Sequence, residues 1–376
     1  MSDQQQAIHE KYMRRALDLA RQAAGHTSPN PAVGAVIVKN DQVVAEGFTQ
    51  PVGKPHAEAE ALRKAGEHAK GATIYVTLEP CNHFGRTPPC TLGIIEAGIK
   101  EVHYSVVDPN PRAAGGHQRL LDAGLTVHTG MFEEEAHQLN RYFFHHTRTG
   151  LPYVTAKFAC SLDGKIATRT GESQWITGPA ARQKGHELRQ LSDGILIGVG
   201  TALADDPRLT TRLPEGDSRE PSHPARVILD TKGKLPETLN LFSGKLPGKT
   251  IVAVSDQISK SDRERLTRPD VELIETKLND CGRIDIHQLL KQLGQQDMQS
   301  LMVEGGSQVL GSFFENGAVD EVWAFIAPKI IGGQAAPGPI GGMGFANLKD
   351  ALELKNIETE QLGPDVFIRG QVKSTK

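Results

Sequence analysis

The sequence is poor in cysteine, aromatic residues and net charge, and it has no long apolar run. Its 4 cysteines in 376 residues are far fewer than a disulfide-stabilised secreted scaffold needs. Its 42 basic and 45 acidic residues give a formal net charge of −3, which argues against a protein that wraps nucleic acid or binds membranes through basic clusters. No stretch reaches the roughly 18 apolar residues of a membrane span, and the N-terminus lacks a signal-peptide pattern, so we expect a cytoplasmic protein.

The composition that remains is typical of soluble globular domains, with 38% hydrophobic and 23% charged residues. The length suggests two or three domains. Helix and strand patterns alternate up to a break at the Gly and Pro of residues 148–152, and then resume. This alternation predicts two α/β domains, residues 1–148 and 151–376.

Hydrophobic periodicity places the main elements of both domains. The expected helices cover residues 13–24, 58–65, 91–97 and 132–146 in the first domain, and residues 183–191, 286–293 and 308–316 in the second. The expected strands cover residues 32–38, 43–45, 73–78 and 102–107, and then residues 154–159, 195–199, 227–230, 251–254, 301–304 and 322–326. A surface loop is expected over residues 213–224, and the isolated Cys160 and Cys281 are expected in the core.

One group of residues carries metal chemistry: His56-Ala57-Glu58, followed by Cys81 and Cys90, each cysteine preceded by proline. One imidazole and two thiolates would give zinc three protein ligands and leave a fourth position for water, which zinc ionises near neutral pH. Both cysteines lie near a predicted helix start, where the helix dipole favours thiolate. Glu58 could then move protons without binding the metal. The H-x-E pattern alone is a weak signal. The alternative is a structural zinc site in which His83 is the fourth protein ligand.

The combination resembles the zinc-dependent cytidine deaminase superfamily, whose signature pairs H-x-E with P-C-x-x-C. Here eight residues separate the cysteines, and PNPAVGAVIV, PHAE and LEPCNHFGRTPPC are similar to the deaminase half of the bifunctional riboflavin-biosynthesis deaminase–reductases. The resemblance implies a cytidine-deaminase-like three-layer sandwich that hydrolyses the 2-amino group of a phosphorylated diaminopyrimidine. It also implies that His56, Cys81 and Cys90 hold zinc and that Glu58 is the proton shuttle.

The resemblance further implies substrate contacts in this half. The residues concerned are Asn30, His83, Asp108 and Asn110. Taken by themselves, Asn30 and Asn110 each precede a proline and could simply form turns. Arg86 suits a phosphate contact, although a solvated loop arginine has the same pattern. Thr49 stands where the family usually has a histidine, so this chain departs from the family at one expected contact.

The second half lacks a G-x-G-x-x-G after a strand, so a Rossmann dinucleotide site is not supported. VEGGSQVL places two glycines between a strand and a helix, where free amides could bind a pyrophosphate or form a plain turn. KFACSLDGKIA, GESQWITG, GVGTALADDPRLTTR, VEGGSQVL and APKIIGG are similar, in this order, to the reductase half of the same family. The resemblance implies a dihydrofolate-reductase-like domain that uses NADPH to reduce the ribosylamino group to ribitylamino.

Binding residues in this half also follow from the resemblance. The implied cofactor contacts are Ala159, Trp175, Thr201, Asp205, Gly306, Ser307, Gln308, Val309, Leu310, Gly311 and Ser312. The implied substrate contacts are Lys157, Ser173, Arg189, Leu209, Arg212 and Glu304. Arg189 and Arg212 suit a phosphate, because a guanidinium holds two oxygens at once. Asp205 and Lys157 both remain candidates for the proton donor of the reduction.

Two other functions compete with this prediction. A deaminase acting on RNA or DNA bases would need a basic strip and stacking aromatics, and it would leave the second half unexplained. A non-catalytic zinc-stabilised binding module would have no use for Glu58. We therefore predict a bifunctional enzyme with one zinc ion per chain and NADPH as cofactors. Its expected partners are a phosphorylated pyrimidine and further copies of itself, with neither nucleic acid nor membrane, and by resemblance deamination precedes reduction.

Overall fold

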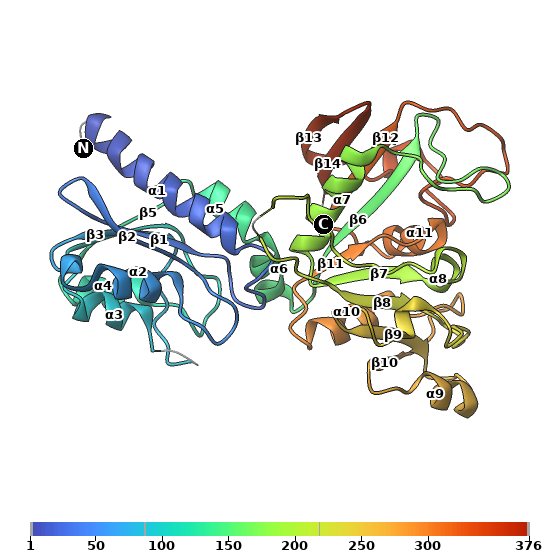
Figure 1. Cartoon of the computed structure of the whole chain (residues 1–376), viewed down its shortest axis with the longest axis horizontal. Helices are drawn as coiled ribbons and strands as arrows, with labels where there is room; N and C mark the ends of the chain where they lie inside the picture. The colour runs from blue at the N-terminus through green and yellow to red at the C-terminus, as the bar shows by residue number, and fades with distance from the viewer. Residues whose placement is uncertain (1–2, 86–87, 218, 374–376) are drawn as a thin grey trace. The chain divides into compact units, whose positions relative to one another are not determined.

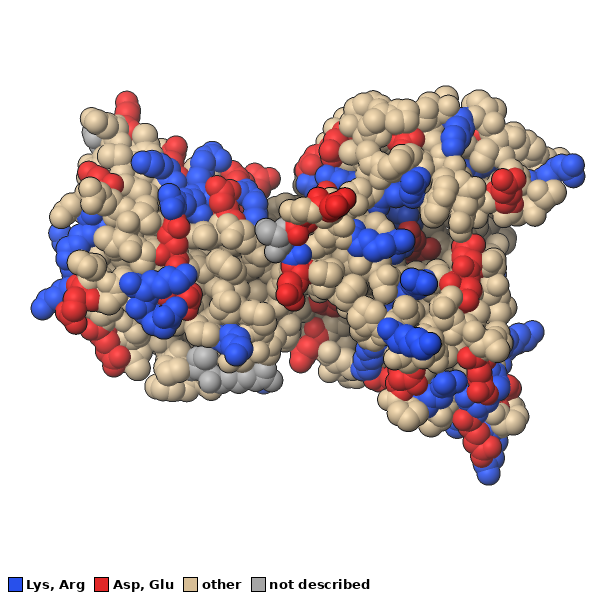
Figure 2. All heavy atoms as spheres, viewed as in Figure 1, with Lys and Arg blue, Asp and Glu red and all other residues tan. Residues whose placement is uncertain are grey.

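The computed structural model describes residues 3–85, 88–217 and 219–373, and the chain divides into two compact units, Met1–Gly150 and Leu151–Lys376 (Figure 1). Each unit has its own sheet and its own apolar clusters. In Figure 2, basic and acidic side chains are interspersed over the visible face of each unit, in keeping with the near-neutral formal charge. Among the described residues, no helix combines the length and the apolar character that crossing a membrane requires.

The first unit is built on a five-stranded sheet with the order β2-β1-β3-β4-β5. Its strands are β1 (Gly34–Lys39), β2 (Gln42–Phe48), β3 (Thr73–Leu78), β4 (Glu101–Val106) and β5 (Thr126–Thr129). Its helices are α1 (Asp3–Ala23), α2 (Ala57–Ala65), α3 (Cys90–Glu96), α4 (Gly116–Asp122), α5 (Glu133–Leu139) and α6 (Arg141–Thr149), with a 3₁₀ turn at Gly66–Ala69. The strands β2, β1 and β3 pair antiparallel, whereas β3, β4 and β5 run parallel.

Helices cover both faces of this sheet. On β1, Ala35 and Ile37 pack into the cluster that contains the apolar residues of α2, while Val36 and Val38 pack against those of α1. This alternation follows from the two-residue period of a strand, and it explains why β1 is apolar at successive positions. The result is a three-layer α/β/α sandwich, with α2, α3 and α4 on one side and α1 and α5 on the other (Figure 1).

Two glycines bring backbone segments close together next to the predicted metal residues. A Cβ on Gly47 of β2 would lie 2.3 Å from the carbonyl oxygen of Ala57, so the first turn of α2 can pack directly on the strand. A Cβ on Gly116 would lie 1.9 Å from the carbonyl oxygen of Pro80, which lets α4 begin against the segment that follows β3. Both close approaches require the absence of a side chain.

The second unit is built on a nine-stranded sheet with the order β10-β9-β8-β7-β11-β6-β12-β14-β13. Its strands are β6 (Tyr153–Ser161), β7 (Gly194–Gly198), β8 (Ala225–Leu229), β9 (Thr250–Ser255), β10 (Val271–Thr276), β11 (Ser300–Val303), β12 (Glu321–Ala327), β13 (Leu354–Leu362) and β14 (Asp365–Val372). Its helices are α7 (Pro179–Leu191), α8 (Val199–Asp205), α9 (Lys260–Leu266), α10 (Ile286–Gly294) and α11 (Ser307–Glu315), with 3₁₀ turns at Asn240–Phe242 and Leu348–Asp350. All neighbouring strands are parallel except β12–β14 and β14–β13.

This sheet is also buried on both faces. Leu196 of β7 packs in the cluster with α10 and α11, whereas Ile195 and Ile197 pack in the cluster with α7, α8 and α9. Strands β6, β11 and β7 run in the same direction, so their carboxyl ends lie at the same edge of the sheet. The start of α11, which follows β11, lies at this edge too. Ligands of parallel α/β sheets bind at such an edge.

The predicted strands and most predicted helices are present, and residues 213–217 and 219–224 form neither helix nor strand. The single helix predicted over residues 132–146 is wrong: it is split into α5 and α6 at Asn140, whose side chain bonds the backbone N–H (2.8 Å) and carbonyl (3.0 Å) of Ala32. Cys160 is buried as expected, but Cys281 is exposed, because it lies in a turn in which its backbone N–H donates to the Asn279 side chain.

Candidate active sites

The first unit brings His56, Cys81 and Cys90 together, with one ligand atom from each within 4.8 Å of the others. His56 is the N-cap residue of α2, Cys81 follows the end of β3, and Cys90 is the first residue of α3. The backbone N–H of Cys90 donates to Cys81 Sγ at 3.4 Å, and the N–H of Thr91 donates to the carbonyl of Cys81 at 3.2 Å. These bonds tie both ends of the loop between the cysteines to one point of the fold.

The distances between the three possible ligand atoms match those around a tetrahedrally coordinated metal ion. His56 Nδ1 lies 3.3 Å from Cys90 Sγ and 3.7 Å from Cys81 Sγ. Zinc bonded to sulfur at about 2.3 Å and to nitrogen at about 2.0 Å would hold these atoms about 3.5 Å apart. Hydrogen bonds from Cys90 and from His56 lower the pKa of Cys81, which favours the thiolate form that binds a metal. The donor set of one imidazole and two sulfurs therefore fits zinc.

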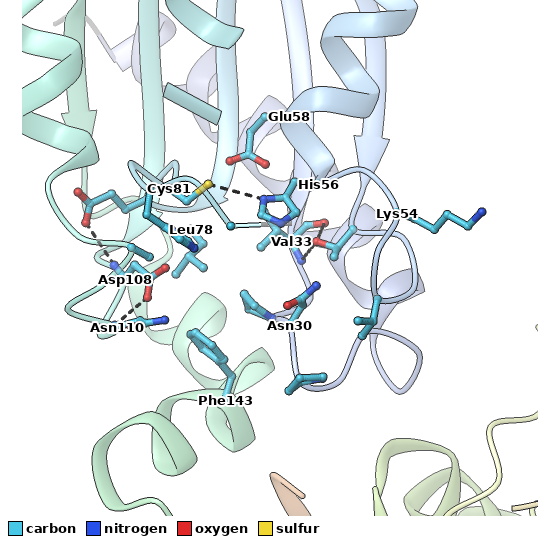
Figure 3. Close-up of a pocket in the computed structure, with 18 of the residues that line it drawn as sticks. Asn30, Val33, Lys54, His56, Glu58, Leu78, Cys81, Asp108, Asn110 and Phe143 are labelled. Atoms are coloured by element: carbon cyan, nitrogen blue, oxygen red, sulfur yellow. Dashed lines mark hydrogen bonds between the residues drawn. The ribbon is translucent and has the colours of Figure 1, made fainter. Parts of the chain in front are cut away.

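Glu58 lies beside this donor set, in the first turn of α2. Its side chain is buried, and Figure 3 shows its carboxylate directed toward His56 and Cys81. Burial, together with the negative charge of Cys81, raises the pKa of Glu58 to about 7. A carboxyl group with a pKa near neutrality can both accept and donate a proton. Among the described residues, the group that could bind a metal here consists of His56, Cys81 and Cys90, and neither Glu58 nor His83 belongs to it.

A cavity of about 300 Å³ opens onto His56, Glu58 and Cys81 (Figure 3). Its lining includes all of the residues predicted to contact the substrate in this half: Asn30, His83, Asp108 and Asn110. His83 Nδ1 is buried without a hydrogen-bond partner in the described part of the chain. Thr49 also lines the cavity, but its hydroxyl is bonded to the backbone N–H (3.1 Å) and carbonyl (3.4 Å) of Val33. Arg86 lies outside the described residues.

The side of the cavity formed by Asp108 and Asn110 is held by internal hydrogen bonds. Asp108 Oδ1 accepts from the N–H of Asn110 at 2.8 Å, and Asn110 Oδ1 accepts from the N–H of Arg112 at 3.1 Å. Asn110 therefore forms the turn that its sequence context suggested, in addition to lining the cavity. Asp108 is buried, and this burial raises its pKa to about 6.

Glu79 is a cavity residue that the sequence analysis missed. Its carboxylate accepts from the backbone N–H of His117 at 2.9 Å and of Asp108 at 3.3 Å, and its side chain is buried. It thereby joins the end of β3 to the start of α4 and to the Asp108 turn. The available signal was its position directly before the Pro-Cys pair that ends with Cys81.

The second unit contains a larger pocket of about 690 Å³. Its lining includes most of the residues predicted for this half: Lys157, Ala159, Ser173, Trp175, Arg189, Thr201, Asp205, Arg212, Glu304, Gly306 and Leu310. Five predicted cofactor residues of α11 do not line it: Ser307, Gln308, Val309, Gly311 and Ser312. Leu209 does not line it either, and its side chain is buried in the core next to α7.

Opposite charges meet inside this pocket. Arg189 Nη2 lies 2.8 Å from Glu304 Oε2, and Lys157 Nζ is bonded to Glu304 Oε1. Burial alone would raise the pKa of Glu304, but Arg189 and Lys157 outweigh it and hold that pKa well below its usual range. His186, which the sequence analysis missed, accepts from the N–H of Arg212 at 3.3 Å, and burial beside Arg189 lowers its pKa to about 4. A single histidine inside a helix gave no signal in the sequence.

The other end of the pocket has the features of a dinucleotide site. The N–H of Gly306, at the start of α11, donates to Thr201 Oγ1 at 3.2 Å, and a Cβ on Gly305 would lie 2.8 Å from the Val309 side chain. Gly305 and Gly306 line the pocket at the start of α11, where the positive end of the helix dipole favours a phosphate. Trp175 is 62% exposed on the pocket rim, and the Arg182 guanidinium lies 4.6 Å from its ring centre. An exposed indole, a cationic group and a glycine turn fit a phosphorylated aromatic cofactor.

Comparison with known proteins assigns both units. Residues 6–106 match the zinc-binding region of cytidine and deoxycytidylate deaminases, and residues 152–368 match the RibD C-terminal domain. The chain is 45% identical to the riboflavin biosynthesis protein RibD of Bacillus amyloliquefaciens over 98% of each chain. The chain belongs to the RibD family. It is also 43% identical to the RibD of Escherichia coli strain K12, over 96% of this chain and 98% of that protein.

Solved RibD-family structures share the whole fold. RibD of Acinetobacter baumannii superposes with a TM-score of 0.87 at 37% identity, over 98% of this chain and 99% of that chain. The deaminase/reductase of Thermotoga maritima superposes with a TM-score of 0.84 at 36% identity, over the same shares. The predicted combination of a cytidine-deaminase-like sandwich and a dihydrofolate-reductase-like domain is thus confirmed. The prediction of an enzyme with a zinc-dependent deaminase domain and a reductase domain of the NADPH-dependent kind is also confirmed.

Proposed function

We propose that this chain catalyses two consecutive reactions of riboflavin biosynthesis. Residues 1–148 hydrolyse the 2-amino group of 2,5-diamino-6-ribosylamino-4(3H)-pyrimidinone 5′-phosphate, and residues 151–376 then reduce the ribosylamino group with NADPH. The product is 5-amino-6-(5-phospho-D-ribitylamino)uracil. The observation that carries the proposal is the buried Glu58 carboxylate next to a His/Cys/Cys donor set that opens onto a cavity. Relatedness to RibD proteins along almost the full length supports it.

In the deaminase half, His56, Cys81 and Cys90 are the proposed zinc ligands, and zinc supplies the acidity that activates a water molecule there. Glu58 takes the proton from that water and delivers it to the leaving amino group, which departs as ammonia. Burial raises the pKa of this carboxyl group, which favours its protonation after it has accepted the proton from water.

The cavity wall orients the pyrimidine. The unpartnered Nδ1 of His83 and the side chain of Asn30 offer hydrogen bonds to polar atoms of the base or sugar. Asp108 is held in position by Glu79 through the backbone, and by the turn at Asn110. These contacts are proposed to place the carbon that bears the 2-amino group next to Glu58. Such fixed orientation of the substrate supplies much of the rate gain of enzymes.

In the reductase half, NADPH supplies a hydride to C1′ of the ring-opened imine form of the ribosylamino group. The glycine turn at Gly306 and the indole of Trp175 are proposed to hold the cofactor. Arg189 and Arg212 are proposed to hold the substrate and its phosphate, because guanidinium groups bind two phosphate oxygens at once. Lys157, fixed by Glu304, and Asp205, whose pKa is raised by burial, are the two groups positioned to donate the proton.

One assay tests the whole proposal. Purified protein with zinc is given the diaminopyrimidine and NADPH, and ammonia and NADPH absorbance are followed in the same sample. We expect one ammonia and one NADPH per substrate, with NADPH loss lagging behind ammonia release. Loss of NADPH without ammonia would contradict it. The proposal also includes self-association and a cytoplasmic location. Light scattering of the purified chain tests the first, and fractionation of cells tests the second.

A further inference from the structure

A row of stacked aromatic rings lies on the α1 face of the first sheet, and none of its members lines the deaminase cavity. Tyr75, His103 and His128 occupy paired positions on β3, β4 and β5. Their ring centres are 4.9 Å and 4.6 Å apart along the row. His9 of α1 stacks on His103 at 4.4 Å. Three imidazoles from a helix and two strands therefore meet at one place.

A carboxylate completes this group. Glu101 precedes His103 by two residues on β4 and therefore points to the same face of the sheet. Its Oε1 atom lies 2.9 Å from His103 Nε2 and 3.3 Å from His128 Nε2. The ligand atoms of His9, Glu101 and His103 all lie within 4.8 Å of one another. His103 is buried, whereas His9, Glu101 and His128 reach partial exposure.

We propose that His9, Glu101 and His103, with water as the fourth ligand, form a second binding site for a divalent cation of the zinc type. Imidazole nitrogen and carboxylate oxygen are ligands that Zn²⁺, Co²⁺ and Ni²⁺ accept, and three of them with one water molecule suit a tetrahedral ion. In such a site, bonds of about 2.0–2.1 Å place neighbouring ligand atoms about 3.3 Å apart. The observed contact of 2.9 Å between His103 Nε2 and Glu101 Oε1 needs only a small shift to reach this spacing.

The surroundings support a metal site in two ways. His9 Nδ1 lies 2.7 Å from the Tyr75 hydroxyl, which leaves Nε2 for the ion and fixes the ring in the manner of an outer-shell partner. A surface hollow of about 410 Å³ is lined by His9 and Glu101 together with Gln5 and Asp41, so an ion can reach His9 and Glu101 from solvent. The bound ion would join α1 to β4.

Metal content per chain tests this proposal on the tag-free, full-length protein. The apoprotein is dialysed against Zn²⁺, and bound zinc is counted in wild type, His9→Ala and the control His68→Ala. His9 is partly exposed, so its truncation leaves the core intact, and His68 is an exposed histidine of the same unit outside the group. We expect two zinc ions per chain in wild type and in the control, and one in His9→Ala. One zinc ion in wild type would overturn the proposal.

Co²⁺ separates the two sites by their ligands. The site with two sulfurs gives thiolate-to-cobalt charge-transfer absorption, whereas a site of imidazoles and a carboxylate does not. In Cys90→Ser we expect one Co²⁺ per chain without charge-transfer absorption, and in Cys90→Ser combined with His9→Ala we expect none.

Stability gives an independent measurement. In the Cys90→Ser background, zinc at 100 times its Kd should lower the unfolding equilibrium constant of the first unit about 100-fold, and adding His9→Ala should abolish this effect. Deamination by His9→Ala alone, with zinc present, should equal that of wild type, so a failure of this proposal is distinguishable from a failure of the deaminase site. A zinc effect of equal size in the double variant would contradict the assignment of His9.

Discussion

Glu304→Gln tests how the charges in the reductase pocket are balanced. The Glu304 side chain is 21% exposed, and those of Lys157 and Arg189 are 16% and 14% exposed. Glutamine keeps the shape of glutamate but removes the negative charge and turns an NH₂ group toward one of the two cations. Two partly buried positive groups would then face each other without a counter-charge. We therefore expect the variant to lose both stability and reductase activity.

The magnitude follows from the separations. At the 2.8 Å between Arg189 Nη2 and Glu304 Oε2, Coulomb attraction at an effective dielectric constant of about 20 amounts to about 6 kcal/mol, before the cost of desolvation. Removing one partner of a buried pair costs about 3–5 kcal/mol, and the residual exposure of Glu304 favours the lower end. About 3 kcal/mol corresponds to a fall in Tm of roughly 6–12 °C for a domain of this size.

Urea unfolding followed by tryptophan fluorescence is the matching assay. Both tryptophans, Trp175 and Trp323, lie in the second unit, so the signal reports this unit alone. Glu264→Gln is the control, because Glu264 pairs with Lys260 at an exposed site of the same unit and should cost less than about 0.5 kcal/mol. If Glu304→Gln unfolds at the same urea concentration as the control, the charge cluster is solvated and the reasoning is refuted.

The stability difference between wild type and Glu304→Gln should depend on pH. The pKa of Glu304 is held well below its ordinary value of 4.5, so its contribution to stability is complete above that pH and is lost as pH falls toward the lower, folded-state pKa. The stability difference between wild type and Glu304→Gln should therefore be constant above about pH 5 and shrink below about pH 4. A difference that grows on acidification would show that Glu304 is not held in its charged form.

Three further predictions concern the zinc ligands, the phosphate contact and the independence of the two halves. Cys90→Ser should lose the thiolate-bound zinc and with it deamination, because a hydroxyl is a poor zinc ligand, and normal charge-transfer absorption with cobalt would contradict this role. Arg212→Ala should raise KM for the reduction roughly 10–100-fold with kcat nearly unchanged, as expected for a charged hydrogen bond that persists into the transition state, whereas a fall in kcat alone would place Arg212 at the reacting carbon. Residues 1–148 should release ammonia without NADPH, and residues 151–376 should oxidise NADPH only with the deaminated pyrimidine; oxidation with the starting diaminopyrimidine would reverse the proposed order.

Local pattern was sufficient for the elements with strong hydrophobic periodicity. The strand over residues 73–78 is found where it was predicted, because its apolar run is bounded by turn residues on both sides. The helix over residues 132–146 was predicted unbroken because Asn140 looks like any polar residue of a helix surface. Its side chain instead bonds the backbone of Ala32, 108 residues away, and such a long-range partner leaves no local pattern.

Some strands and helices were not predicted because their sequences show no regular alternation of apolar and polar residues. β13 exposes almost every side chain, and β10 mixes buried and half-buried positions, so neither shows a clean strand period. Within the described residues, β13 pairs only with β14, and β14 joins this hairpin to the sheet by pairing with β12. α4 begins at a glycine whose role depends on the close approach of Pro80, which is likewise invisible in a local window.

The two sites differ in how far the sequence could predict them. The metal-binding residues His56, Cys81 and Cys90 have a distinctive spacing, and the structure brings them together. The reductase residues came from family resemblance, and the structure places most of them on one pocket, although Leu209 packs in the core. Glu79 and the pocket histidine of α7 act through contacts across the fold, so neither spacing nor composition pointed to them.

The central claim is that Glu58 is the proton shuttle of a zinc-dependent deaminase joined to an independent reductase. Glu58→Gln, compared with Glu60→Gln on the same helix, measures it most directly, because Glu60 does not line the cavity and pairs with Arg63 and Lys64. Zinc content, ammonia release and NADPH oxidation are measured on the same preparations. The account predicts that Glu58→Gln keeps its zinc, loses at least ~10²-fold in deamination rate and reduces pre-deaminated substrate at the wild-type rate. A variant that deaminates at near-normal rate, or that loses its zinc, would contradict the account.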